Sequence, residues 1–285
     1  MSVIRIVSYN IHKGRSAGGG RESLADLRLG LYGLRPDLLF LQEVQGRNEQ
    51  RISLHAQHES LAAALDMSAA YGCNAMRTRT DHGNALLSRH PILLHENLDI
   101  SDHRLEQRGL LHAVVDVDGT PVHCLVVHLG LFGGGRERQV AALVKRIQTW
   151  VPADEPILIA GDFNDWGNRL APLFVEQLQL YEVFAIAPQS GIAVPGGMRG
   201  PLKRIRTSLR GSRLSPLARE VHELGHEGAS RLSLPPRTFP AAFPWLRLDR
   251  IYQRGFAVRQ ARVLHGSPWR QLSDHAPLMA ELELP

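Results

Sequence analysis

The most constraining feature of the sequence is the apolar run 157–160, which leads directly into Gly-Asp-Phe-Asn at 161–164. A short apolar run that ends at a glycine predicts a buried β-strand followed by a tight turn. Asp162 and Asn164 are two residues apart, so on an extended backbone their side chains point the same way. A carboxylate beside a carboxamide suits the binding of a water molecule and a phosphate oxygen. Asp and Asn in such a peptide are equally consistent with a turn that caps its own backbone.

The composition is that of a globular protein without a disulfide framework. The chain has 285 residues, of which 44% are hydrophobic, and this is enough to fill a large core. Its two cysteines, Cys73 and Cys124, lie among apolar residues, where buried reduced thiols are expected. The N-terminus lacks the apolar region of a signal peptide, and no stretch reaches membrane-spanning length. We therefore expect a cytoplasmic location.

The positive charge of the chain is concentrated in one segment. The whole sequence has a formal net charge of +5, whereas residues 196–237 alone hold nine Lys or Arg against three acidic residues. Within it, the run 199–219 contains seven basic residues and no acidic one. We interpret residues from about 190 to 236 as a basic insertion that attracts a polyanion in a salt-sensitive way. A solvated or disordered insertion would have the same composition.

The pattern of an apolar strand that delivers a polar residue recurs along the chain. Alternation over residues 3–9 predicts a strand that ends at Asn10, and the apolar run 37–41 predicts a second strand with Glu43 at its end. The leucine spacing over residues 22–34 predicts a helix between them. Further elements are expected as a short helix at 61–65, strands at 69–75 and 84–88, and a helix at 136–150.

The second half of the chain repeats this arrangement. Residues 110–117 and 122–127 predict a hairpin whose second strand ends at His128. A strand over residues 245–252 would carry Asp249 in its middle.

Polar side chains at or beside strand ends form one predicted group: Asn10, Glu43, His128, Asp162, Asn164, Asp249, Asp274 and His275. Binding and catalytic residues concentrate where rigid strands meet loops, so we expect these side chains to share a site. Carboxylates and amides without a cysteine cluster favour Mg²⁺ or Mn²⁺ over zinc as the bound metal.

Seven short motifs of the chain resemble those of the endonuclease/exonuclease/phosphatase superfamily and occur in the same order. They are Ser-Tyr-Asn-Ile at 8–11, Leu-Gln-Glu-Val at 41–44, Gly-Asn-Ala-Leu-Leu-Ser-Arg-His-Pro-Ile at 83–92, Val-His-Leu-Gly at 127–130, Gly-Asp-Phe-Asn at 161–164, Leu-Asp-Arg-Ile-Tyr at 248–252 and Ser-Asp-His-Ala-Pro-Leu at 273–278. Members of the superfamily include deoxyribonucleases, abasic-site endonucleases, deadenylases, inositol-polyphosphate phosphatases and neutral sphingomyelinases. The resemblance implies an α+β fold, a four-layer α/β/β/α sandwich of two mixed β-sheets with outer helices. It also implies a single domain over residues 1–285.

The resemblance further implies metal-binding and substrate-binding residues. Glu43 matches the main metal ligand, Asn10 would help to position the ion or the phosphate, and Asp274 could support a second metal site. Asn84 and Arg108 fall in or near the motifs and are candidates for contact with the substrate phosphate. Whether one Mg²⁺ or Mn²⁺ ion acts, or two, stays open.

The remaining matched positions are implied to be catalytic. Asp162 would orient or deprotonate the attacking water, and Asn164 would contact the scissile phosphate. Asp249 and His275 match a carboxylate–imidazole pair whose cationic ring donates to the phosphate. His128 would contact the phosphate from the other side.

The sequence thus predicts a metal-dependent phosphoesterase that cleaves phosphodiester bonds of a polyanion, with nucleic acid slightly favoured. Hydrolysis of a phospholipid or inositol phosphate at a membrane surface is the alternative, because Leu and Ile accompany the basic residues of 199–219, and this run could touch a membrane peripherally. A non-catalytic polyanion-binding module is a further alternative. The oligomeric state is not predicted.

A competing motif predicts a different enzyme. His222 and His226 flank Glu223 in the H-E-x-x-H pattern of zinc peptidases. Gly225 weakens the helix that this pattern requires, and the family's usual downstream histidine is absent. A short polar helix within the insertion is the favoured interpretation.

Overall fold

The computed structural model describes residues 2–103, 106–188 and 234–284. The chain divides into two compact units, residues 1–187 with 234–285, and residues 188–233. Apart from positions 234–236, the predicted basic insertion lies outside the described residues, and so does the His222–His226 motif. The single-domain organisation therefore stays a prediction, and the larger unit carries the rest of the structure.

Two six-stranded sheets form the centre of the larger unit. In spatial order, the first sheet is β11 (Ala257–Val263), β12 (Leu278–Glu283), β1 (Val3–Asn10), β2 (Leu38–Val44), β4 (Asp81–Ser88) and β3 (Ser68–Met76). The second is β5 (Ile92–Asp99), β6 (Gly109–Val117), β7 (Thr120–His128), β8 (Ile157–Asp162), β10 (Asp249–Arg254) and β9 (Tyr181–Glu182). Both sheets are mixed, because β1 and β2 pair in parallel, as do β7 and β8, whereas the other pairs are antiparallel.

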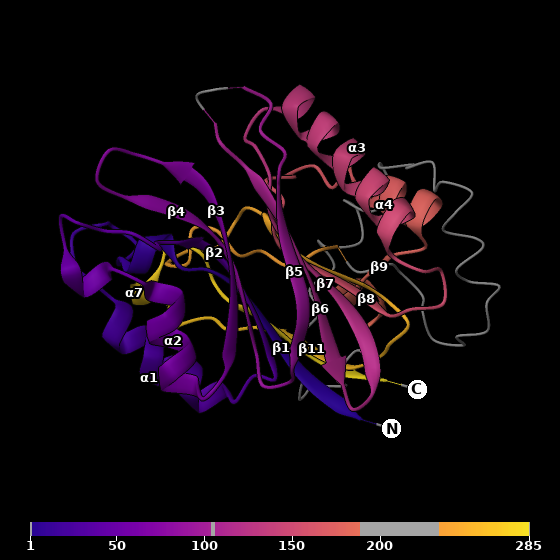
Figure 1. The fold of residues 1–285 in the computed structure, drawn as a ribbon, viewed down its shortest axis with the longest axis horizontal. Coiled ribbons are helices and arrows are strands. Elements are labelled where there is room, and N and C mark those ends of the chain that lie inside the picture. The colour runs from indigo at the N-terminus through magenta and orange to yellow at the C-terminus, as the bar shows by residue number, and fades with distance from the viewer. Residues whose placement is uncertain (1, 104–105, 189–233, 285) are drawn as a thin grey trace, which may run out of the picture. The chain divides into compact units, whose positions relative to one another are not determined.

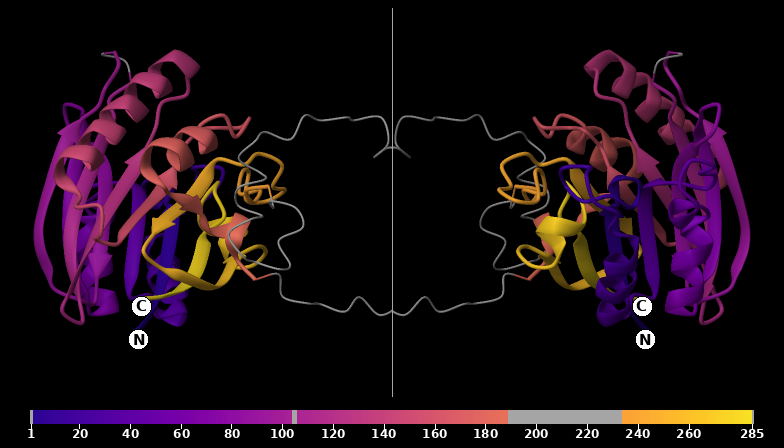
Figure 2. Two further views of the ribbon diagram at one scale, coloured as in Figure 1. Left: turned by 90° about the vertical axis from the view of Figure 1, so that its right-hand side faces the viewer. Right: turned by 90° about the vertical axis from the view of Figure 1, so that its left-hand side faces the viewer.

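Helices cover the outer face of each sheet. The first sheet is flanked by α1 (Leu24–Leu34), α2 (Gln57–Leu65) and the short α7 (Trp269–Leu272), and the second by α3 (Gly133–Trp150) and α4 (Ala171–Leu178). The remaining short helices are η1 (His12–Gly14), η2 (Ile52–Leu54) and α5 (Val183–Ile186). Figures 1 and 2 show the two helical layers on opposite sides of the paired sheets. The predicted four-layer sandwich is confirmed.

Three apolar cores explain why the central strands are apolar on both faces. In β8, Leu158 and Ala160 pack in the core between the two sheets, whereas Ile157 and Ile159 pack beneath α3 and α4. Successive strand residues point to opposite faces, so a strand that separates two cores must be apolar throughout. The apolar run from 157 to 160 has this structural cause.

Some local expectations were wrong in detail. Strand β10 begins at Asp249, so this residue does not lie in the middle of a strand. The preceding residues instead form a turn in which Phe239 pairs with Leu246, and Pro240 and Pro244 lie within it. Cys73 is exposed, because it lies on β3 at the edge of its sheet.

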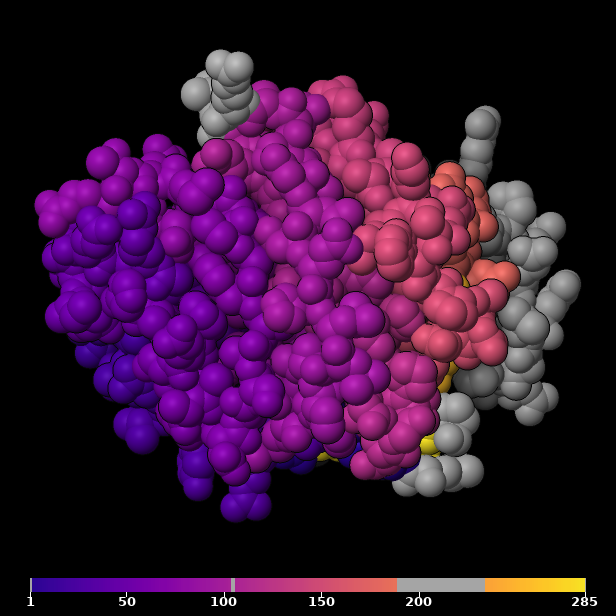
Figure 3. Space-filling view, viewed as in Figure 1, coloured from indigo at the N-terminus to yellow at the C-terminus, as the bar shows by residue number. Residues whose placement is uncertain are grey.

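The chain ends lie together at one end of the strands. The backbone N–H of Leu284 donates to the carbonyl of Ser2, and the two termini are neighbours in the ribbon view (Figure 1). On the face seen in Figure 3, the C-terminal strands are largely covered by earlier parts of the chain. Among the described helices, none is long and apolar enough to cross a membrane.

Candidate active site

Three predicted site residues form a row across neighbouring strands of the second sheet. His128 at the end of β7 is in register with Asp162 at the end of β8, and Asp162 is in register with Asp249 at the start of β10. All three side chains are buried. Because strand pairing fixes this row, His128, Asp162 and Asp249 reach the same end of the sheet without help from loops.

The first sheet contributes to the same place through the ends of β1 and β2. Asn10 is the last residue of β1, and its amide Nδ2 donates to Asp162 Oδ2 at 3.3 Å. In β2, the pairing with β4 is interrupted between Leu41 and Val44, and Glu43 adopts a left-handed φ of 54° there. Such an irregularity turns a side chain out of the sheet's regular alternation. The two sheets therefore meet at Asp162.

Asp162 is the centre of the polar cluster. Its Oδ1 accepts a hydrogen bond from the backbone N–H of Asn164 at 3.0 Å, which holds the turn after β8. Its Oδ2 lies 3.5 Å from His128 Nε2 and 3.6 Å from His275 Nε2. Asn164, with a left-handed φ of 49°, donates from Nδ2 to the Leu129 carbonyl at 2.9 Å. One carboxylate oxygen thus faces two imidazoles.

Asp162 is protonated more easily in its surroundings than an aspartate is in water. Burial raises the pKa of Asp162 to about 6, although the cationic ring of His275 acts in the opposite direction. The charge of Asp249 adds to the increase in the pKa, and the N–H of Asn164 opposes it. Near neutral pH, Asp162 therefore exchanges a proton far more readily than an exposed aspartate does.

His275 is bound to Asp249 in the predicted carboxylate–imidazole pair. His275 Nδ1 lies 2.9 Å from Asp249 Oδ2, and the ring of Phe239 packs 4.9 Å from the imidazole centre. Burial alone would lower the pKa of His275, but the charges of Asp249 and Asp162 outweigh it and raise the pKa to about 10. His275 is therefore cationic at neutral pH.

His128 is in the opposite protonation state. Burial and the nearby Arg108 guanidinium lower the pKa of His128 well below its ordinary value, so its ring is neutral. Asp162 is consequently flanked by one cationic imidazole, from His275, and one neutral imidazole. Groups whose environments push their pKa values apart are suited to different steps of acid–base chemistry.

Glu43 carries a partner that the sequence analysis missed. Its Oε2 lies 2.8 Å from the Lys13 ammonium. Burial alone would raise the pKa of Glu43, but the Lys13 ammonium, through its charge and its hydrogen bond, lowers it well below its ordinary value. His82 lies near this pair and is neutral, because burial lowers its pKa to about 4. The signal for Lys13 was present in the polar pair at positions 12 and 13, which begins two residues after Asn10.

A tight turn holds Lys13 in place. His12, Lys13 and Gly14 have successive left-handed φ values of 47°, 58° and 66°. The N–H of His12 donates to Asn10 Oδ1 at 3.1 Å, and the buried Gln57 amide donates to the Lys13 carbonyl at 2.8 Å. A side chain at Gly14 would collide with Gln57, so only glycine fits this position.

The two predicted substrate-binding residues are placed differently. Asn84 is buried, and its Nδ2 donates to the carbonyls of Gly109 and Val126, which links the two sheets. Its Oδ1 has no hydrogen-bond partner among the described residues. Arg108 lies near His128, as its effect on the pKa of that ring shows. A direct role of either residue in substrate binding stays a prediction.

The residues present suit a hard divalent cation. Glu43 keeps its negative charge at all ordinary pH values, and its side chain is 19% exposed, so an ion can reach it. The side-chain amide oxygen of Asn10 is a second hard donor. Asp162, Asp249 and His275 each offer a ligand atom within 4.8 Å of the others and form an alternative group. The protonated, Asp249-bound state of His275 makes that trio a better hydrogen-bond relay than a ligand set.

Asp274, the candidate for a second metal, lies beside the first group. Its Oδ1 accepts a hydrogen bond from Ser273 Oγ at 3.2 Å and lies 3.9 Å from His12 Nδ1. Ser273 Oγ also contacts the carbonyl of Asn10 at 2.7 Å, which ties this loop to β1.

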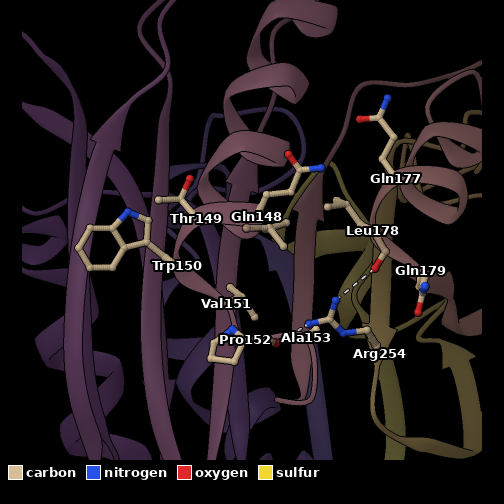
Figure 4. A pocket seen from close by; sticks show the side chains of 11 residues that line it. Gln148, Thr149, Trp150, Val151, Pro152, Ala153, Gln177, Leu178, Gln179 and Arg254 are labelled. Carbon is tan, nitrogen blue, oxygen red and sulfur yellow. Dashed lines mark hydrogen bonds between the residues drawn. The ribbon is translucent and has the colours of Figure 1, made fainter.

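A hollow elsewhere on the molecule lies apart from these residues. It has a volume of about 550 Å³ and is lined by the ends of α3 and α4 and by Arg254. Figure 4 shows the Arg254 guanidinium donating to the Leu178 carbonyl, at 3.3 Å. None of the predicted site residues that the structure describes lines this hollow.

Comparison with known proteins identifies the family. The sequence profile of the Endonuclease/Exonuclease/phosphatase family matches residues 7–275. The chain belongs to this family. Members of the family are typically hydrolases of phosphoester bonds and commonly use divalent metals.

Individual relatives agree with this assignment. The chain is 35% identical to the uncharacterized protein YbhP of Escherichia coli strain K12, over 98% of this chain and 96% of that protein. An endonuclease/exonuclease/phosphatase structure from Beutenbergia cavernae superposes with a TM-score of 0.70 at 21% identity, over 100% of this chain and 72% of that chain. D. rerio TDP2 in complex with a single-strand DNA product superposes with a TM-score of 0.63 at 18% identity, over 99% of this chain and 100% of that chain. These two structures share the fold.

Proposed function

We propose that the chain is a divalent-metal-dependent phosphodiesterase acting on a polyanionic substrate, with nucleic acid favoured over phospholipid or inositol phosphate. The observation that carries this proposal is the convergence on Asp162 Oδ2 of His128, His275 and Asn10, from three separate strand ends and loops. Family membership supports hydrolysis of phosphoester bonds. The DNA product bound to the fold relative TDP2 supports nucleic acid as the substrate class.

In this proposal, each residue has a role set by its charge. Glu43 and Asn10 would hold Mg²⁺ or Mn²⁺, with Asp274 as support for a second ion, and the bound metal would supply Lewis-acid stabilisation of a phosphate oxygen. Asp162, with a pKa raised to about 6, orients the attacking water and accepts its proton. The cationic ring of His275, fixed by Asp249, donates to a phosphate oxygen.

His128, Asn164 and the two remaining candidates complete the proposed pocket. The neutral His128, on β7, lies across Asp162 from Asp249, the partner of His275, and assists the departing oxygen through a hydrogen bond. Asn164 contacts the scissile phosphate. Arg108 adds positive charge beside His128, and Asn84 positions the strands that carry these groups.

A substrate panel tests the proposal directly. Plasmid DNA, abasic duplex, RNA, phospholipid vesicles and inositol phosphates are each incubated with and without Mn²⁺. We expect turnover of at least one nucleic acid, complete loss in EDTA, and a loss of about 100-fold to 10,000-fold in kcat for Asp162→Asn. His275→Ala, purified in parallel, exposes any contaminating nuclease.

The alternatives give different results in the same panel. A zinc peptidase would turn over nothing in the panel, and its cleavage of a peptide would be lost in His222→Ala and kept in Asp162→Asn. A non-catalytic binding module would bind DNA or lipid and cleave nothing with Mg²⁺ or Mn²⁺. Turnover of phospholipid or inositol phosphate alone would replace nucleic acid as the substrate. A cytoplasmic location remains part of the proposal and is checked by cell fractionation.

A further inference from the structure

Exposed aromatic side chains lie just beyond the row formed by His128, Asp162 and Asp249. Phe132 is four residues after His128 in the chain, and 66% of its surface is exposed. Along the chain, the exposed aromatic residues nearest to Asp162 and Asp249 are Trp166 and Trp245, each 59% exposed.

The spacing places these aromatic residues at one end of the sheet. Trp166 lies in the turn four residues after Asp162, where the chain leaves β8, and Trp245 lies in the turn four residues before Asp249, where the chain enters β10. The pairing of β8 and β10 continues beyond Asp162, because the N–H of Phe163 donates to the Leu248 carbonyl at 2.9 Å. Both tryptophans therefore lie beyond the same end of the paired strands β8 and β10.

The turn that carries Trp245 is attached to the site itself. It also carries Phe243, which is 79% exposed. The ring of Phe239 contacts His275, and the N–H of Ala241 donates to the Asp274 carbonyl at 2.6 Å. Substrate that touches this turn is thus within reach of His275.

The charges on the segments of Trp166 and Trp245 are positive, whereas Phe132 follows Leu131, whose N–H donates to the Glu106 carboxylate. Arg169 and Arg237 are exposed on the two segments that carry Trp166 and Trp245. Neither residues 166–175 nor residues 234–248 contain an Asp or Glu. Exposed aromatic rings among arginines, without carboxylates, are typical of surfaces that bind a nucleic-acid strand by stacking and by charge.

We propose that Phe132, Trp166, Phe243 and Trp245, called here the aromatic collar, stack on unpaired bases next to the phosphate bound at Asp162. This inference rests on the proposed function and names its substrate class as single-stranded nucleic acid. Adjacent strands are about 4.8 Å apart, so the three strand ends from which these segments leave span roughly 10 Å. That spread suits bases held apart from one another, whereas a duplex hides its base faces.

Binding without turnover tests the aromatic collar. Fluorescence anisotropy with a labelled oligothymidylate is measured in EDTA for wild type, Trp166→Leu and Trp245→Leu. We expect each substitution to weaken binding about tenfold, the effect of losing one stacked base. Trp166→Phe and Trp245→Phe, which keep a flat ring, should restore most of the affinity. Thermal unfolding confirms that each variant is folded.

Trp150 provides a matched control. It is also 59% exposed, but it lines the hollow at the end of α3 (Figure 4). Trp150→Leu should bind the oligonucleotide as wild type does. An equal loss of affinity in Trp150→Leu and Trp166→Leu would overturn the proposal.

A second probe separates stacking from charge. An abasic oligomer of the same length keeps the phosphates and lacks the bases. Wild type should therefore bind it more weakly than it binds the oligothymidylate. The tryptophan variants and wild type should bind the abasic oligomer with equal affinity. If the variants lose affinity for both oligomers alike, the collar does not stack on bases. Tighter binding of vesicles of equal phosphatidylglycerol and phosphatidylcholine than of either oligomer would assign the collar to a membrane and overturn the inference.

A small substrate distinguishes this inference from the proposed function. Hydrolysis of bis-p-nitrophenyl phosphate with Mn²⁺ by wild type reports on the proposed function without any nucleic acid. If wild type hydrolyses no phosphodiester but binds the oligonucleotide through both tryptophans, the proposed function fails and the collar stands. If hydrolysis persists while oligonucleotide binding ignores both tryptophans, the collar fails alone.

Discussion

The Lys13 ammonium lies 2.8 Å from the carboxylate of Glu43, the residue assigned to the metal. The same turn brings His12 Nδ1 to 3.9 Å from Asp274 Oδ1, so each proposed metal-binding carboxylate faces a side chain from η1. The Glu43 charge is therefore already balanced when no metal is bound. A divalent cation that takes Glu43 as a ligand is repelled by the Lys13 ammonium and competes with it for this carboxylate.

Removing Lys13 should strengthen metal binding. In Lys13→Met, the cation no longer competes for Glu43, and we expect the Kd for Mn²⁺ to fall about fivefold, which corresponds to about 1 kcal/mol for a partly exposed ion pair. Isothermal titration calorimetry measures this change without any substrate. Lys145→Met, on the exposed face of α3, is the matched control and should bind Mn²⁺ as wild type does. Weaker binding in Lys13→Met would show that Lys13 supports the metal site.

Asp249→Asn should change the alkaline pH dependence of stability. The folded-state pKa of His275 is raised to about 10, so its protonation stabilises the fold fully below its ordinary pKa, and this contribution is lost as the pH rises towards 10. Asp249 is the largest cause that raises this pKa, so Asp249→Asn should flatten the decline. Urea unfolding at several pH values between 6 and 10 measures the slope. Parallel curves for the two proteins would contradict the assigned role of Asp249.

The activity should fall on the acid side as Asp162 gains a proton. Its pKa is raised to about 6, so the carboxylate needed for water activation is lost as the pH falls through that value. The same shift means that folding stability rises as the pH falls from 6 towards 4, because the folded state binds the proton more tightly. A pH profile of kcat/KM for a small phosphodiester, with unfolding measured alongside, tests both signs. Activity that stays constant down to pH 4 would exclude Asp162 as the base.

Asn84→Ala should reduce the free energy of unfolding more than it reduces kcat. The substitution leaves the carbonyls of Gly109 and Val126 without their hydrogen-bond donor, and each buried unpaired group costs about 1–3 kcal/mol. We expect the free energy of unfolding to fall by about 2–4 kcal/mol in urea titrations. An unchanged free energy of unfolding together with a large loss of kcat would show instead that Asn84 acts on the substrate.

Much of the fold followed from the chain's apolar patterns. The run at 157–160 is apolar on both faces because β8 separates two cores, and this burial is visible in the sequence. The position of Asp249 was less predictable, because the apolar residues before it, such as Trp245, are exposed in a turn. Cys73 was misjudged for a related reason, since no local pattern reveals which strand will be at a sheet edge.

The protonation states of the site could not have been read from the chain. His128 and His275 have the same side chain, and each lies next to an apolar strand. His128 is the last residue of β7, and His275 lies three residues before β12. Burial lowers the pKa of the first, whereas Asp249 and Asp162 raise the pKa of the second. Coulombic interactions depend on distances of a few ångströms. The register of β7, β8 and β10 sets those among His128, Asp162 and Asp249, whereas His275 comes from the loop before β12 in the other sheet.

The sequence by itself determined which residue types reach the strand ends, because hydrophobic periodicity marks the strands and their ends mark the polar residues. Only the tertiary structure decided that Lys13 meets Glu43 and that Asn10 reaches across to Asp162. Those contacts join residues far apart in the chain, and they depend on a left-handed turn and on how the two sheets pack. The local sequence carries strong information about secondary structure and little about such packing.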